Sequence, residues 1–223
     1  QCRSNLKQIG IALEQYVSAH QMFPLAAGCR SGPLVGLLPY LDQQPLYEQV
    51  DWSATRCETV APVKGTVIPT FLCPSDPAPS KLGPSACSSY LGNAGTGILR
   101  AGYNGLFRYP FNSAPDRYRM GPVRLGGEND GLSHTAAFAE IRHADGSQDR
   151  LRVVWETPQK YYAENEQEAF ASVCQGIPPV PTDYGWRGDP WALGSTWTCG
   201  DMSFGLYVHV LPPNQPSCSN GGA

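Results

Sequence analysis

The sequence is poor in charge. Asp, Glu, Lys and Arg make up 16% of its 223 residues, against about 25% in an average soluble domain. The net charge is -3 and the basic residues are scattered, which excludes the dense basic surface that nucleic-acid binding needs. The chain also lacks a run of roughly 20 apolar residues, the length of a membrane-spanning helix. It has neither an initiator Met nor a signal peptide, so an exported protein must have lost its targeting segment.

Its eight cysteines lack the C-x-x-C spacing of zinc ribbons and thioredoxin-like motifs. An even number of widely spaced cysteines in loop-rich surroundings favours disulfides over free buried thiols, and hence an oxidising compartment. We therefore expect an exported protein, periplasmic or extracellular. The pairing stays open among Cys2, Cys29, Cys57, Cys73, Cys87, Cys174, Cys199 and Cys218.

Turn-forming residues are abundant instead, with 24 Gly and 21 Pro, which favours short strands joined by long ordered loops. Apolar residues at helical intervals predict an amphipathic helix over residues 1–19, ended by Phe23-Pro24. No capping residue precedes this helix, as though the chain began inside a longer one. The residues expected on its packing face are Leu6, Ile9, Leu13 and Tyr16.

Further elements are shorter. The apolar stretch 34–41 predicts helical turns hinged at prolines, and acidic residues followed by an apolar face predict a helix over 163–174. Residues 66–73 form an extended segment or edge strand, because Pro69 cannot donate to a ladder.

The strongest strand patterns lie at 135–142 and 151–155, and a weaker one at 88–92. The first two are separated by a short polar stretch, so they predict a β-hairpin. His143 and Asp145 are expected in its solvated loop rather than in a metal site.

Six short motifs then occur in order along the chain. They are CRSNLKQIGIAL (2–13) with Phe23-Pro24, LLPYLDQ (37–43), FLCPSDP (71–77), YLGN (90–93), DGLSHT (130–135) and LPPN (211–214). Together they resemble a large bacterial family of pseudopilin-like proteins, best known from planctomycetes, that carries a prepilin-type cleavage and methylation signal. The sequence departs from the family at both ends, because the leader with its apolar helix and the usual C-terminal segment are absent.

The resemblance implies an α+β, pilin-like fold in which an N-terminal helix packs on an antiparallel sheet with disulfide-held loops. One head domain would span 1–223, with the pilin helix at 1–20, a helix-loop-sheet body at 21–155 and a Trp- and Cys-rich region at 156–223. It further implies a non-catalytic subunit of a cell-envelope, type II secretion or type IV pilus-like assembly. The assembly face of the helix would be formed by Leu6, Ile9, Leu13 and Tyr16. Its partners would be other pilin-like subunits or further copies, and the precursor would be membrane-anchored through the missing helix alone.

An alternative is an extracellular module that binds carbohydrate or another solute, which an older label for the family suggests. Aromatic rings stack on sugars and anchor interfaces, but in a region with little regular structure they also fill small cores. The residues in question are Tyr184, Trp186, Trp191 and Trp197.

Other chemistry has weaker support. A hydrolase would need Asp130, His134 or Glu140 to converge, whereas Asp and Ser side chains in a turn usually bond to the local backbone. No cofactor is expected. Calcium, which prefers several oxygen ligands, has candidates without the dense spacing of a calcium loop: Asp183, Asp189 and Asp201.

Overall fold

The computed structural model describes residues 1–26, 31–53, 60–95, 105–108, 121–125, 135–145, 147, 149, 151–152, 154–157, 166–176, 185–186, 193–201 and 204–219. Its helices are α1 (Cys2–His20), α2 (Pro33–Gly36), α3 (Gln44–Tyr47) and α4 (Gln167–Gln175), with 3-10 turns η1 (Leu38–Leu41) and η3 (Pro69–Phe71). Its strands are β1 (Lys81–Leu82), β2 (Ser85–Ala86), β3 (Tyr90–Asn93), β4 (Phe138–Glu140), β5 (Val154–Glu156), β6 (Gly185–Trp186), β7 (Leu206–Tyr207) and β8 (Ser217–Ser219). The α+β class is confirmed.

Helix α1 follows the predicted apolar periodicity. Ile9 and Leu13 are buried in the main core, and Leu6 and Tyr16 are partly buried against the same core. The helix ends where Gln21 takes a left-handed conformation and donates its N–H to the carbonyl of Val17, a common helix C-cap arrangement. The predicted packing face is therefore turned towards the head itself. The expectation that these four residues form an assembly face is wrong, because their side chains pack into the head's own core.

The short helices after α1 have a proline at their first or second position. Each of α2, η1 and α3 has a proline in its first turn, where the missing N–H costs no hydrogen bond and the fixed φ suits a helix. The predicted series of short turns is confirmed. Residues 69–71 form the 3-10 turn η3 rather than an extended strand, because Pro69 starts a helical turn there as well.

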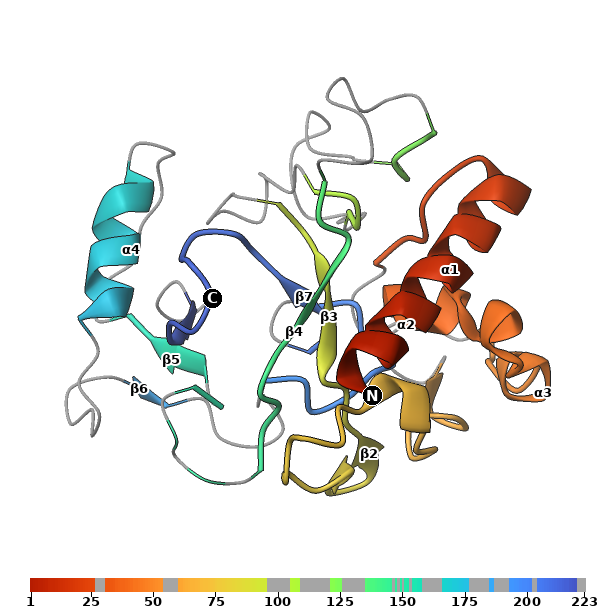
Figure 1. Ribbon diagram of the computed structural model, residues 1–223, viewed down its shortest axis with the longest axis horizontal. Coiled ribbons are helices and arrows are strands. Elements are labelled where there is room, and N and C mark those ends of the chain that lie inside the picture. The colour runs from red at the N-terminus through yellow and green to blue at the C-terminus, as the bar shows by residue number, and fades with distance from the viewer. Residues whose placement is uncertain are drawn as a thin grey trace.

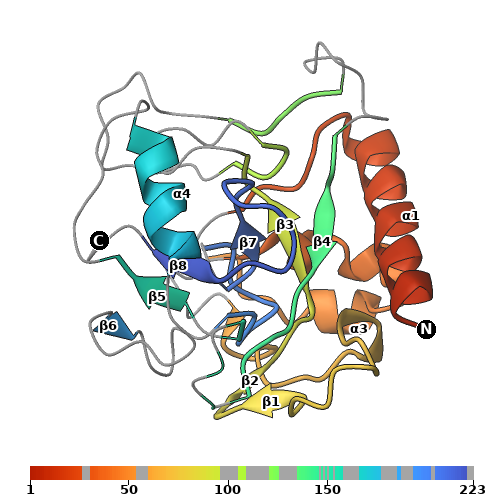
Figure 2. The ribbon, with the colours of Figure 1, turned by 60° about the vertical axis from the view of Figure 1, so that its left-hand side comes forward.

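Two three-stranded sheets carry most of the β-structure, one ordered β4-β3-β7 and the other β6-β5-β8. In the first, β3 is antiparallel to β4 and parallel to β7. In the second, β5 is antiparallel to β6 and parallel to β8. Figures 1 and 2 show the first sheet between α1 on one side of the molecule and α4 on the other.

The predicted hairpin is wrong. Strands β4 and β5 exist close to the expected positions, but they belong to different sheets. Between them the chain turns so that Arg152 is buried and bonded to Asp76. An alternating pattern identifies a strand but not its partner, and β5 pairs with β8 from much later in the chain.

Two disulfides join distant segments. Cys2–Cys73 ties the start of α1 to the loop after η3, and Cys174–Cys218 ties α4 to β8. Cys87 and Cys199 are buried, and Cys29 and Cys57 lie outside the described residues. Disulfides of this kind indicate an oxidising, extracellular or periplasmic environment. Within the described ranges, no helix has the length and apolar character needed to cross a bilayer.

Candidate functional site

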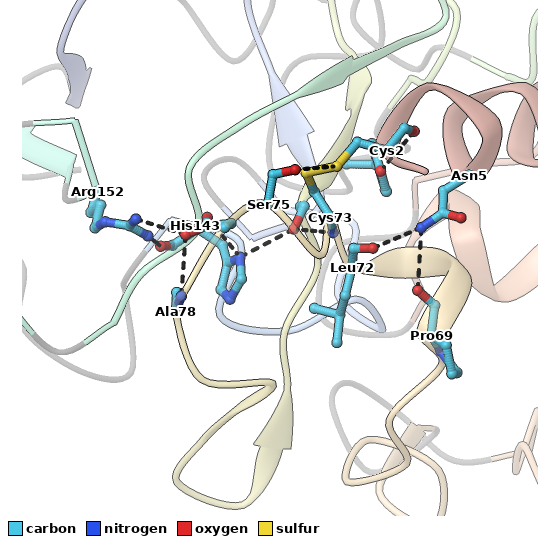
Figure 3. The surroundings of a disulfide bond; sticks show 12 residues. Cys2, Asn5, Pro69, Leu72, Cys73, Ser75, Ala78, His143 and Arg152 are labelled. Atoms are coloured by element: carbon cyan, nitrogen blue, oxygen red, sulfur yellow. Dashed lines mark hydrogen bonds and ion pairs between the residues drawn. A yellow bond between two sulfur atoms is a disulfide. The ribbon is translucent and has the colours of Figure 1, made fainter.

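The first turn of α1 is fixed to the body by a disulfide and by side-chain hydrogen bonds, and Figure 3 shows the disulfide and the bonds of Asn5. The Cα atoms of Cys2 and Cys73 are 4.7 Å apart. Asn5 donates its side-chain N–H to the carbonyl of Leu72 at 2.8 Å, and the Tyr90 hydroxyl donates to the carbonyl of Cys2 at 3.0 Å. Because these contacts come from the loop after η3 and from β3, the helix start cannot move independently of the sheet.

Tyr90 is buried under this helix start. Burial, and next the negative charge of Glu140 across the β3–β4 pair, raise the pKa of Tyr90 to about 12, against an opposing hydrogen bond with Asn5. The phenol therefore stays neutral at any physiological pH and keeps its proton for the carbonyl of Cys2.

Next to the disulfide lies a buried ion cluster centred on Asp76. Arg152 donates Nη2–H to Asp76 Oδ1 at 2.7 Å and Nη1–H to the carbonyl of His143 at 2.7 Å. Its Nε lies 3.3 Å from Asp145 Oδ2. The Arg152 and Asp76 side chains are 4% and 6% exposed, so this pair is far better shielded from solvent than an ordinary surface salt bridge.

The cluster determines the protonation of Asp76. Burial alone would raise its pKa, but the hydrogen bonds from Arg152 and from the Ala78 N–H, with the charges of His143 and Arg152, outweigh burial and hold the pKa of Asp76 below its usual value. The hydrogen bond with Asp76 in turn raises the pKa of Arg152. Both groups are charged in the folded protein at neutral pH.

His143 belongs to the same cluster, and the expectation that it lies in a solvated loop is wrong. Its side chain is 1% exposed. Its Nε2 lies 3.0 Å from the carbonyl of Pro79, which can only accept, so Nε2 carries a proton. Its Nδ1 lies 3.2 Å from Ser89 Oγ and 3.3 Å from Asp76 Oδ2. Arg152 and His143 both hold the Asp76 loop, and this draws the segment after β4 inwards.

Ser89, His143 and Asp76 are the residue types of a hydrolytic triad, but their geometry is different. In a triad the Ser and the carboxylate contact opposite nitrogens of the imidazole. Here both approach Nδ1, while Nε2 is bonded to a main-chain carbonyl. Ser89 Oγ also accepts the N–H of Cys73 at 3.0 Å. The arrangement supports the loop and offers no relay from Ser89. Of the residues considered for a hydrolase, Asp130 and His134 lie outside the described residues, and Glu140 is exposed at the end of β4.

An open hollow of about 490 Å³ lies beside the cluster. It separates the end of β4 from the segment that leads into β8. Eight of its thirteen lining residues are polar or charged, and none of these described residues is aromatic. The lining residues are Cys73, Ser75, Asp76, Pro77, Glu140, Ile141, Arg142, Leu151, Arg152, Leu193, Asn214, Gln215 and Ser217.

Of the aromatic residues considered as a ligand surface, Trp197 is a core residue. It is fully buried, its Nε1 donates to the carbonyl of Thr66 at 2.9 Å, and it packs against Phe71. A ligand-binding role for Trp197 is therefore wrong, because no face of its ring is accessible. The backbone of Trp186 pairs with Trp155 in the second sheet. Tyr184 and Trp191 lie outside the described residues.

Of the three calcium candidates, Asp201 is the one within the described residues. Asp183 and Asp189 lie outside the described residues, and Asp201 accepts the N–H groups of Gly205 and Leu206 with its main-chain carbonyl. Across the described ranges, the one group of possible ligand atoms within 4.8 Å of one another is Cys2, Cys73 and Glu140. Both sulfurs of this group form the disulfide, so neither is a thiolate ligand.

The sequence analysis did not identify the Asp76 cluster. Asp76 lies in the FLCPSDP motif, whose Pro74 and Pro77 indicate only a local turn, and Arg152 is a single charge within the apolar run LRVVW. That isolated charge was the available signal, because a charged residue inside a buried strand pattern needs a buried partner.

These features define a disulfide-bonded α+β protein whose N-terminal helix is tied to its sheet at the first turn. A family model described as "Protein of unknown function (DUF1559)", with the label SBP_bac_10, matches residues 1–218. The chain belongs to this family. No curated protein and no solved structure matches the chain.

Proposed function

We propose that this protein is the head of a pseudopilin-like subunit in a cell-envelope assembly, with a structural and non-catalytic role. The observation that carries the proposal is that α1 has one buried face and one exposed face. One face of this helix packs on the head's own core, and the opposite face is exposed along its length. A helix so placed can contact a neighbouring subunit without disturbing the fold of the head.

The exposed face of α1 supports such a contact. Ile11 is 44% exposed at its centre, flanked by Lys7, Glu14 and Ser18, which are also exposed. An apolar side chain surrounded by polar ones is the usual composition of a modest protein–protein contact. Further copies of this chain or related subunits are the partners we propose.

The clamp at the helix start, formed by the Cys2–Cys73 disulfide and the hydrogen bonds of Asn5 and Tyr90, also fits an assembly role. In a filament or pseudopilus, load on the helix must reach the head. Cys2–Cys73 provides a covalent route from the first turn, and Asn5 and Tyr90 add hydrogen bonds to the η3 loop and to β3. Pulling on α1 would therefore load the sheet rather than peel the helix away.

We further propose that the precursor is exported and held in the membrane by an apolar helix ahead of Gln1, as the resemblance to prepilin-processed proteins suggests. The test is mass spectrometry of the mature N-terminus of the protein isolated from its native cell envelope. We expect an N-methylated residue followed by a long apolar run. An ordinary signal-peptidase end, with no apolar helix, would overturn this anchor.

A further inference from the structure

Strand β4 is an edge strand with one side unused. It pairs with β3, and no strand of the described chain pairs with its other side. Ile141 donates its N–H to the carbonyl of Ser89, and Asn93 donates to the carbonyl of Ala137. Because main-chain groups alternate in direction along an antiparallel strand, the N–H and C=O groups of Phe138 and Glu140 point away from β3.

The hollow beside the ion cluster lies at the C-terminal end of this edge strand. Glu140 and Ile141 both line it, and their side chains lie on opposite faces of the sheet, so the hollow meets the C-terminal end of β4. The hollow is also lined by the polar residues Asn214, Gln215 and Ser217, which precede or begin β8. An extended peptide placed here would meet main-chain groups on one side and hydrogen-bonding side chains on the other.

The charges around the hollow are unbalanced. Arg152 is neutralised by Asp76 and Asp145, and Arg142 pairs with Asp149 at 3.0 Å. Glu140 has no ion-pair partner among the residues that the structure describes, and its side chain is exposed. The charged side chains around the hollow therefore carry a net negative charge, and the carboxylate of Glu140 lies at the strand edge itself.

We propose that the outer edge of β4 binds an extended peptide segment that carries a basic side chain opposite Glu140. The main-chain groups of Phe138 and Glu140 provide strand addition, a recurrent mode of peptide recognition, and Glu140 provides selectivity for charge. The rigid Asp76–Arg152–His143 cluster beneath the site keeps the edge in place, so little ordering is required on binding. The site does not use the exposed face of α1 around Ile11, so this proposal and the assembly proposal can fail separately.

The test is an NMR titration of the ¹⁵N-labelled protein with two synthetic peptides, acetyl-Thr-Val-Thr-Lys-Thr-Val-Thr-amide and its analogue with Glu in place of Lys. We expect the Lys peptide to shift the amide signals of residues 138–142 and to slow hydrogen exchange at Phe138 and Glu140. We expect the Glu peptide to bind about tenfold more weakly. No shift at residues 138–142, or equal affinity for both peptides, would overturn the proposal.

Three variants sharpen the result. Glu140→Lys should reverse the preference between the peptides. Glu140→Pro should abolish binding of both, because it removes an outward N–H while leaving the bonds to β3 intact. Glu14→Lys, the same change of charge on the exposed face of α1, should change nothing. Amides of Leu91 and Ala139 that stay protected from hydrogen exchange in the free variants would show that the pairing of β3 with β4 is intact. Retained binding by Glu140→Pro would then contradict strand addition.

Discussion

Arg152 and Asp76 are 76 positions apart in the sequence, and their side chains meet at 2.7 Å in the interior of the protein. The bond connects the turn before β5 to the loop that carries Cys73. Arg152 also donates to the carbonyl of His143, which follows β4. The Arg152 side chain therefore links both sheets and the loop that anchors α1.

Replacing Arg152 should lower the free energy of unfolding substantially. Arg152→Met leaves the Asp76 carboxylate buried without its main partner, and breaking such a pair costs about 3–5 kcal/mol. The matched control is Arg142→Met, which breaks the exposed pair with Asp149 and should cost about 1 kcal/mol or less. Urea unfolding of both variants measures the difference, and similar losses would contradict the structural role of the cluster.

The cluster also predicts acid sensitivity. The pKa of Asp76 is lower in the folded protein than its ordinary value of 3.8, so the folded state binds the proton of this group less tightly than the unfolded state does. The ionised Asp76 carboxylate therefore makes its full contribution to the free energy of unfolding at pH values well above 3.8. This contribution is lost as the pH falls through the lower pKa that Asp76 has in the folded protein. The stability difference between the wild type and Asp76→Asn should therefore shrink between about pH 6 and about pH 3. A difference that stays constant with pH would show that Asp76 is not held ionised.

Gly194 should tolerate no side chain. Its φ is +63°, and a Cβ atom there would collide with the main-chain carbonyl of Ser88. Gly83 has a similar φ of +57° but open space around the Cβ position. We expect Gly83→Ala to cost about 1–2 kcal/mol from backbone strain alone, and Gly194→Ala to cost more than twice as much. Thermal unfolding compares the two, and equal losses would show that the contact between Gly194 and Ser88 is not tight.

The two disulfides should be separable. Peptide mapping under non-reducing conditions should recover Cys2 linked to Cys73 and Cys174 linked to Cys218. The double variant Cys2→Ser with Cys73→Ser should lose about 2–4 kcal/mol and exchange the amides of the first turns of α1 faster. Replacing Cys174 and Cys218 by Ser is the control and should leave those amides protected. Equal exchange at α1 in both variants would contradict the clamp.

The helices could be predicted from the sequence because their signals are local. The apolar spacing of α1 and the proline-initiated turns after it depend on residues within a few positions of one another. The α+β class was implied by the family resemblance, and the helical and short strand patterns agreed with it.

Strand pairing and the ion cluster could not be predicted, because both depend on distant contacts. The patterns of β4 and β5 indicated strands, but their partners are β3, β6 and β8. His143 has the sequence surroundings of a loop, and it is buried because Asp76, Pro79 and Ser89 converge on it from far along the chain. No periodicity in the sequence records such an approach.

The exposed face of α1 is where the proposed assembly is tested most directly. A photoreactive p-benzoylphenylalanine in place of Ile11, in the full-length protein expressed in its native cells, should form covalent multimers of this chain on irradiation. The same group in place of Glu168, exposed on α4 on the other side of the head (Figures 1 and 2), serves as the control and should give fewer of them. Monomer alone at Ile11, in cells where the protein is present at its normal level, would contradict assembly through this helix.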